Sequence, residues 1–179
     1  MMARNPVRHL VLDNEAAQAL SCVRTGDQQR AAVVEAIMAA NGRVVVPTAV
    51  RVEAGWRRRD HGAANANRLV GNDAPLDLAD ADRAVQLRRL VPAASVVDTT
   101  VAVAAERVAA DVASSVVEVL TSDVADISAL AAHVQVWMWS RCEPRAPARA
   151  CSAREWRTFT TVGSERRRAW WPLPVADRW

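Results

Sequence analysis

Four acidic residues of this 179-residue chain stand where a folded protein can gather them. Three of them, Asp13, Asp98 and Asp123, follow a β-prone run, either directly or after a two-residue turn. In open parallel α/β sheets ligands bind beyond the carboxyl ends of the strands, so acids at these ends can share one pocket. Taken singly, each is more often a helix cap or a first-turn acid that complements the helix dipole.

The fourth acid, Glu53, is predicted on a helix from Ala49 to about Arg58. Helical spacing places Glu53 on the same face as Val52 and Trp56, in the stripe that would meet the core. An ionised carboxylate there is costly unless its charge is compensated, and a bound metal ion would do so. The alternative is that Glu53 lies at the edge of the stripe and pairs with Arg57, four residues on.

Several carboxylates in one pocket repel one another, and a hard cation with oxygen ligands relieves that repulsion. Mg²⁺ or Mn²⁺ fits such a donor set best. Two such ions, roughly 3.5–4 Å apart, activate water and stabilise the leaving oxygen in phosphodiester cleavage. The sequence has no Walker A motif, no GxGxxG fingerprint, no Ser-His-Asp order and no zinc-type spacing of His or Cys, so it does not predict those chemistries.

The elements predicted around these acids form an α/β domain. β-prone runs at Val7–Leu12, Arg43–Val46 and Val116–Leu120 alternate with helical patterns, which predicts parallel strands joined by crossover helices. Two further strands are expected at Pro75–Leu78 and Val134–Trp139. The helices are expected at Asn14–Cys22, Asp27–Ala40, Ala49–Arg58, His61–Val70, Ala79–Leu90, Asp98–Ala110 and from Asp123 to Ala132.

The acids lie in four segments that carry a family resemblance. In chain order the segments are LVLDNEA, VVPTAVRVEAGW, VVDTTVAVAA and VLTSDVADISALA. They resemble the four acidic motifs of PIN-domain nucleases, over roughly residues 8–136, and look most like the bacterial branch that contains the VapC-type toxin ribonucleases. The resemblance implies a three-layer α/β/α PIN-like fold with a central, mostly parallel sheet.

The resemblance also assigns roles to residues. It implies that Asp13 and Asp98 are metal ligands, that Glu53 completes the cluster, and that Asp123 anchors the second metal ion or its water. These four acids would be the catalytic residues of an endoribonuclease that depends on Mg²⁺ or Mn²⁺. Three further polar residues would support the cluster: Asn14, Thr121 and Asp126.

The implied partners are RNA as substrate, an antitoxin protein and a second copy of the chain in a homodimer. The chain would then be the toxin of a type II toxin–antitoxin system. The alternative is a catalytically inactive PIN-fold module that binds RNA or protein, although a pure binder has no need of four clustered acids. No signal peptide and no apolar run of about 20 residues is visible, so a cytoplasmic protein without a membrane partner is expected.

Composition changes sharply after about residue 136. Residues 137–179 hold six of the seven Trp, and residues 141–179 hold nine Arg against four acids. Pro residues interrupt this segment and no periodicity survives. We therefore expect a PIN-like nuclease domain over residues 1–140 and an irregular Arg/Trp-rich extension over residues 141–179, as an altered reading frame in G/C-rich DNA would produce. The alternative is a Trp-rich arm that binds nucleic acid or a partner.

One basic run lies close to a predicted site residue. Arg57, Arg58 and Arg59 follow Glu53 by only a few positions and could grip phosphates near the acids. Such a run is more often a solvated helix end, favoured there by the helix dipole.

Overall fold

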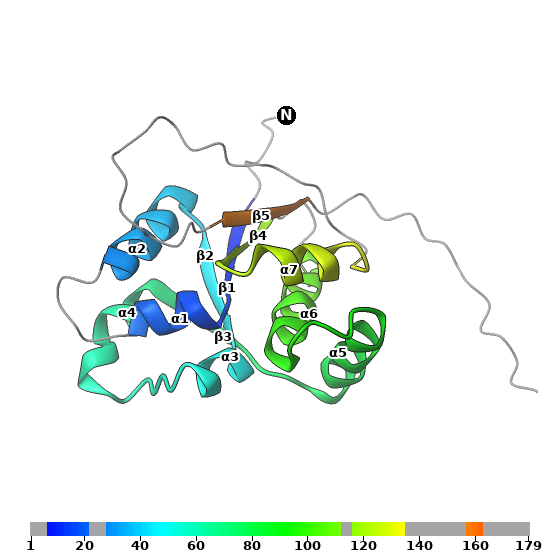
Figure 1. Cartoon of the computed structure of the whole chain (residues 1–179). Helices are drawn as coiled ribbons and strands as arrows, with labels where there is room; N and C mark the ends of the chain where they lie inside the picture. Colours follow the sequence, from blue (N-terminus) through cyan, green and yellow to red (C-terminus); the bar gives the residue numbers. More distant parts are fainter. Residues whose placement is uncertain (1–6, 22–27, 112–115, 135–156, 163–179) are drawn as a thin grey trace, which may run out of the picture.

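The computed structural model of the chain describes residues 7–21, 28–111, 116–134 and 157–162. Within these ranges, helices enclose a five-stranded sheet with the strand order β3-β2-β1-β4-β5 (Figure 1). The strands are β1 (Arg8–Leu12), β2 (Arg43–Pro47), β3 (Val70–Ala74), β4 (Val116–Thr121) and β5 (Arg157–Val162).

The strand β1 lies at the centre of the sheet, parallel to β2 on one side and to β4 on the other. β3 continues the parallel pairing beyond β2, and β5 pairs with β4 in the antiparallel direction. Strands buried on both faces need apolar side chains throughout, and Leu10–Leu12 and Val44–Val46 are such runs. The prediction of a central, mostly parallel sheet is therefore confirmed.

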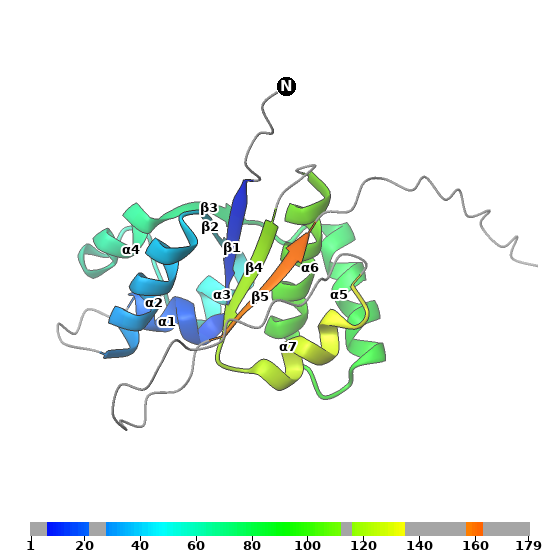
Figure 2. The same cartoon turned by 90° about the horizontal axis from the view of Figure 1, so that it is seen from above.

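Helices cover both faces of the sheet, which gives the three-layer α/β/α architecture that was predicted (Figure 2). α1, α2 and α4 lie on one side, α5, α6 and α7 lie on the other, and α3 contacts both α1 and α6. The helical elements are α1 (Asn14–Ser21), α2 (Gln28–Ala40), α3 (Thr48–Glu53), the 3₁₀ turn η1 (His61–Ala63), α4 (Ala64–Leu69), α5 (Leu78–Leu90), α6 (Val96–Asp111) and α7 (Val124–Ala131).

The core consists almost entirely of Val, Ala, Leu and Ile side chains. On α6, the small residues Ala102, Ala105 and Ala109 recur at helical spacing and are buried, which lets the helix approach the sheet closely. None of the helices in the described ranges combines the length and the apolarity needed to cross a membrane.

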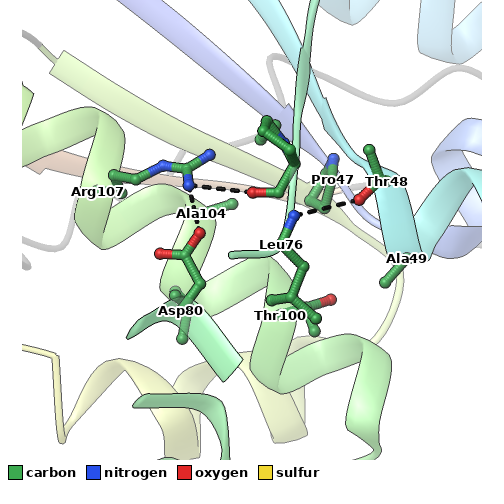
Figure 3. Close-up of a pocket in the computed structure, with 11 residues that line it drawn as sticks. Pro47, Thr48, Ala49, Leu76, Asp80, Thr100, Ala104 and Arg107 are labelled. Carbon is green, nitrogen blue, oxygen red and sulfur yellow. Dashed lines mark hydrogen bonds and ion pairs between the residues drawn. The ribbon is translucent and has the colours of Figure 1, made fainter. Parts of the chain in front are cut away.

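Charged side chains join α5 to α6. α5 begins with a capping box, in which Asp77 and Asp80 each accept a hydrogen bond from the backbone N–H of the other. Arg107 of α6 pairs with Asp80 and donates to the carbonyl of Pro75 at 3.0 Å (Figure 3). The hollow beside this pair has a volume of only about 10 Å³, so it is a packing seam and not a ligand site.

Two local predictions between β2 and α5 are wrong. The strand expected at Pro75–Leu78 lies earlier, at β3, and Leu78 instead begins α5. The helix expected at His61–Val70 is divided into η1 and α4, and ends at Leu69. The interior of β3 is Gly-Asn-Asp, residue types that favour turns, and it forms a strand because its backbone pairs with β2.

The extension after residue 141 contains one described strand. β5 pairs with β4 from Arg157 to Val162, so the expectation of irregular structure does not hold for these residues. The run Thr-Phe-Thr-Thr-Val is rich in β-branched residues, and β4 without β5 would have an unpaired edge. The strand expected at Val134–Trp139 lies, beyond Val134 itself, outside the described residues.

Candidate functional site

An open pocket of about 160 Å³ lies at the carboxyl end of the parallel strands. It is formed where the starts of α1 and α6, the end of α3 and the turn between β4 and α7 come together. All four acids predicted from the sequence line this pocket, which we call the acidic pocket. Its lining residues are Asp13, Asn14, Glu15, Glu53, Ser95, Val97, Asp98, Ser122 and Asp123.

Asp13 is the most enclosed acid of the pocket, with only 4% of its surface exposed. Its Oδ1 accepts the N–H of Ala16 at 2.7 Å, and its Oδ2 accepts the N–H of Ser122 at 3.2 Å. Burial raises the pKa of Asp13 to about 6, although these hydrogen bonds and one from Thr121 oppose the rise. A nearby cation would therefore stabilise the ionised form of this carboxyl group.

Thr121, at the end of β4, connects two of the acids. Its side chain is fully buried and hydrogen-bonds to Asp13, and its Oγ1 accepts the N–H of Asp123 at 2.9 Å. Thr121 thus lies behind the acidic pocket, between Asp13 and Asp123, where the sequence led us to expect a supporting residue.

Asp98 and Asp123 each hydrogen-bond to backbone at the start of a helix, Asp98 from the first turn of α6 and Asp123 as the N-cap of α7. Asp98 Oδ2 accepts the N–H of Ser95 at 3.1 Å, and Ser95 Oγ accepts the N–H of Asp98 at 3.0 Å. Asp123 is the N-cap of α7 and its Oδ1 accepts the N–H of Asp126 at 3.2 Å. In each carboxylate the second oxygen lies outside these capping hydrogen bonds, so capping does not use up the group's capacity to bind a ligand.

Two residues predicted to support the cluster lie beside it. The pKa of Asp126 is raised by partial burial and then by the negative charges of Asp123 and Asp98, so Asp126 lies within electrostatic reach of both acids. Asn14 lines the acidic pocket, and its buried Oδ1 has no hydrogen-bond partner among the described residues.

Glu53 lines the pocket, but the reason we gave for its position is wrong. Val52 is 82% exposed and Glu53 is exposed too, so this face of α3 does not meet the core. α3 ends at Glu53 because Gly55, with φ of 64°, and the next residue donate their N–H groups back to carbonyls of the helix. This is a Schellman motif, and Gly55 was the sequence signal for it. No ion pair between Glu53 and Arg57 is found in the described ranges.

Sequence reasoning missed Glu15 and Ser122. The hydroxyl group of Ser122 donates to Glu15 Oε2, while the N–H of Ser122 donates to Asp13. Ser122 therefore ties the turn after β4 to the first turn of α1. Glu15 could have been found by its position, because first-turn side chains of a helix that begins at a strand end surround the same pocket.

The donors around the pocket are carboxylate, amide and hydroxyl oxygens, the set that Mg²⁺ and Mn²⁺ prefer. No three acidic, His or Cys side chains among the described residues lie close enough together to hold a metal ion in this arrangement. Asp13 directs both oxygens to backbone N–H groups, whereas Glu53 is exposed and has room to rotate. The oxygen donors and the negative charge of these residues suit a hard cation. Side chains would have to rotate to complete a coordination shell.

Comparison of the chain with protein-family models, with curated proteins and with solved structures finds no match. A function for the chain is therefore inferred from the acidic pocket, which is a property of the folded chain.

Proposed function

We propose that the protein is an endoribonuclease that depends on a divalent metal ion, Mg²⁺ or Mn²⁺. One observation carries the proposal: acids from four separate elements, between positions 13 and 123, line one pocket beyond the carboxyl ends of the parallel strands. Like charges gathered in this way raise the energy of the folded chain unless a cation binds among them. The resemblance of the four segments to PIN-domain motifs supports the same function.

Four acids would hold the metal: Asp13, Glu53, Asp98 and Asp123. When bound, the ion would activate water and stabilise the leaving oxygen of a phosphodiester. Asp13 and Asp98 are fixed by backbone N–H groups, so their carboxylates are already positioned. Glu53 is exposed at the end of α3, so it would complete the site by rotation about its side-chain bonds.

A second candidate function is a PIN-fold module that binds RNA or protein without cutting. The capping hydrogen bonds of Asp98 and Asp123 favour it, because they give these acids a structural role that does not need a metal. The separation of the acids in the present arrangement favours it too. RNA binding without cleavage at any metal concentration would distinguish this function from the first.

RNA cleavage by the full-length chain tests the proposal. We expect a mixture of structured and single-stranded RNAs to be cut in the presence of Mn²⁺ or Mg²⁺ and to stay intact in EDTA. Addition of excess Mn²⁺ to the EDTA sample should restore cleavage. If neither ion supports cleavage of any RNA in the mixture, the enzyme assignment is wrong and the binding module remains.

The proposal extends to the setting of the enzyme. A toxin of the VapC type would bind an antitoxin, form a homodimer and be located in the cytoplasm. Co-expression with any small gene that adjoins the coding sequence tests the antitoxin: its product should co-purify with the chain and suppress cleavage. Light scattering of the isolated chain gives its mass and thereby tests the dimer.

A further inference from the structure

The three consecutive arginines after α3 differ in what they contact. Arg58 donates to both carboxylate oxygens of Asp73 at 2.9 Å, and Arg51 donates to the same carboxylate at 2.6 Å. Arg58 is therefore already paired. Arg57 lines an open pocket of about 310 Å³, and its side chain has no ion pair or hydrogen bond within the described part of the chain. Arg59 is exposed and lines neither this pocket nor the acidic pocket.

The pocket that Arg57 lines, which we call the Arg57 pocket, adjoins the acidic pocket. Asn14 lines the acidic pocket, while Gln18 and Ser21, further along the same face of α1, line the Arg57 pocket. On the opposite wall, Glu53 belongs to the acidic pocket and the next residue, Ala54, to the Arg57 pocket. The two pockets therefore lie next to each other along α1, and Asn14 and Ser21 are about 10 Å apart along the helix axis at a rise of 1.5 Å per residue.

The residues on either side of Arg57 are held in place. Trp56 is buried, and its indole N–H donates to Asn67 at 3.2 Å. Asn67 in turn donates to the carbonyl of Arg58 at 2.7 Å, and Arg58 is paired with Asp73. The backbone at Arg57 is thus fixed before a ligand arrives, which lowers the ordering cost of a contact made there.

The chemistry of the Arg57 pocket suits a phosphate group. A guanidinium group binds phosphate oxygens through two parallel N–H bonds. No atom lies within 4 Å of where a side chain on Gly55 would begin, so a ligand can approach this wall closely. Asp60 is the acid of the pocket, and it forms no ion pair with Arg57.

We infer that the Arg57 pocket binds the phosphate of a single-stranded RNA next to the phosphodiester held at the acidic pocket, with Arg57 as the phosphate ligand. The inference depends on the proposed function for the position of the neighbouring phosphodiester. We propose a single strand as the substrate class, because its unpaired nucleotides can enter two neighbouring open pockets of about 160 and 310 Å³ in succession.

RNA binding without cleavage tests the inference. Full-length chain in EDTA is titrated against a fluorescein-labelled, ten-nucleotide single-stranded RNA, and anisotropy gives the affinity over a series of NaCl concentrations. Arg57→Ala should weaken binding about tenfold, as the loss of a charged hydrogen bond does. It should also reduce the slope of log affinity against log salt by about 0.7, the value for one phosphate contact on a single strand. Arg57→Lys should recover part of the affinity.

Two variants are the controls. Arg59→Ala removes the same charge outside the pocket and should change binding less than twofold, and Asp60→Asn removes the opposing acid and should strengthen binding. Equal weakening by Arg57→Ala and Arg59→Ala, or no binding by the parent chain at 50 mM NaCl, would overturn the inference. Cleavage with Mn²⁺ is scored separately. RNA binding that depends on Arg57, without any cleavage, would rule out the proposed function but not the phosphate site at Arg57. Cleavage that Arg57→Ala leaves unchanged would rule out the phosphate site but not the proposed function.

Discussion

The carboxylate of Asp98 hydrogen-bonds to the backbone at the start of α6 and also lines the acidic pocket. One oxygen accepts the N–H of Ser95 and thereby caps α6, while the other lies outside that bond. An amide keeps the capping oxygen and loses the charge, whereas Ala loses both. Substitutions of different kinds therefore separate the structural role of this residue from the chemical role that we propose for it.

Asp98→Asn should reduce RNA cleavage by on the order of 100-fold or more, because a charge that would hold the metal is removed. The melting temperature in EDTA should stay equal or rise slightly, since repulsion from Asp123 and Asp126 falls while the cap is kept. Asp98→Ala should lower stability by about 1 kcal/mol, the usual contribution of one hydrogen bond, because the capping-box bond from the N–H of Ser95 is lost. The measurements are initial cleavage rates at saturating Mn²⁺ and thermal melts in EDTA. Cleavage by Asp98→Asn at the parent rate would show that Asp98 is only a cap.

His9 on β1 is buried, and neither of its ring nitrogens has a hydrogen-bond partner among the described residues. Burial, and then the charge of Arg43, lower its pKa below the ordinary 6.5. The unfolded chain therefore takes up a proton at His9 more readily than the folded chain. Protonation of His9 consequently lowers the free energy of unfolding as the pH falls below about 6.5, whereas above that pH His9 is neutral in both states and the full stability is present.

We expect His9→Leu to lose less stability than the parent chain when the pH is lowered from 7.5 to 5.5. Urea unfolding at both pH values measures this difference. His133→Gln, which replaces an exposed histidine, is the control variant. An identical pH dependence in His9→Leu and the parent would mean that His9 is protonated equally in the folded and unfolded chain.

The site residues differ in how far the sequence could predict them. Asp13 and Asp123 reach the acidic pocket because strand ends of a parallel sheet meet at one edge, a rule that sequence alone can apply. Asp98 reaches it for another reason than predicted, because it follows no strand and lies in the first turn of α6, which begins after α5. Glu53 reaches it for a different reason than predicted, because α3 stops there at the Gly55 turn. Glu15 could have been predicted from its place in the first turn of α1, but its contact with Ser122 depends on how α1 packs against the β4–α7 turn, which no local pattern encodes.

At the scale of elements, the start of β2 is packed so closely against β1 that it needs a glycine. A Cβ atom on Gly42 would lie 2.8 Å from the carbonyl oxygen of Arg8 and 2.9 Å from its Cβ. Gly71, at the edge strand β3, would meet nothing within 4 Å. The two glycines can therefore be compared directly, because a Cβ atom would be crowded by the neighbouring chain at Gly42 and unhindered at Gly71.

Gly42→Ala should destabilise the chain by about 1–3 kcal/mol, because β1 and β2 must move apart to admit the methyl group. Gly71→Ala should be neutral or stabilise by up to about 1 kcal/mol, since it only restricts the unfolded chain. Midpoints of urea unfolding measure both. Equal midpoints for the two variants would contradict the close approach of Gly42 to Arg8.

The elements that sequence reasoning placed well are the central ones. β1, β2 and β4 are long apolar runs whose burial on both faces decides their structure. β3 and β5 lie at the edges of the sheet, where the sequence is less informative: β3 carries turn-forming residues, and the β-branched run of β5 lies within a segment rich in Trp, Arg and Pro. These strands form because a neighbour offers an unpaired backbone edge, and that interaction cannot be read from the strand alone.

At the scale of the whole molecule, β5 makes the segment after residue 141 part of the sheet. A chain that ends at residue 140 should be less stable and more prone to aggregate than the full chain, because the edge of β4 is then unpaired. A chain that ends at residue 162 keeps β5 and should melt at the temperature of the full chain. Thermal melts and light scattering of the three chains test this. Equal melts for the chains ending at 140 and at 162 would show that β5 adds nothing to the fold.

The pairing of β1 with β4 also fixes when the acidic pocket can exist. β1 leaves the ribosome before the other strands of the sheet, and Ser122, whose N–H donates to Asp13, follows Asp13 by 109 residues. At about 5–20 residues per second, synthesis of that interval takes roughly 5–20 seconds. During this time Asp13 has neither Thr121 nor Ser122 beside it, and Asp123 has not been made. The acidic pocket is therefore incomplete until β4 has been synthesised and has docked against β1, so the nuclease activity that we propose would begin only after that step.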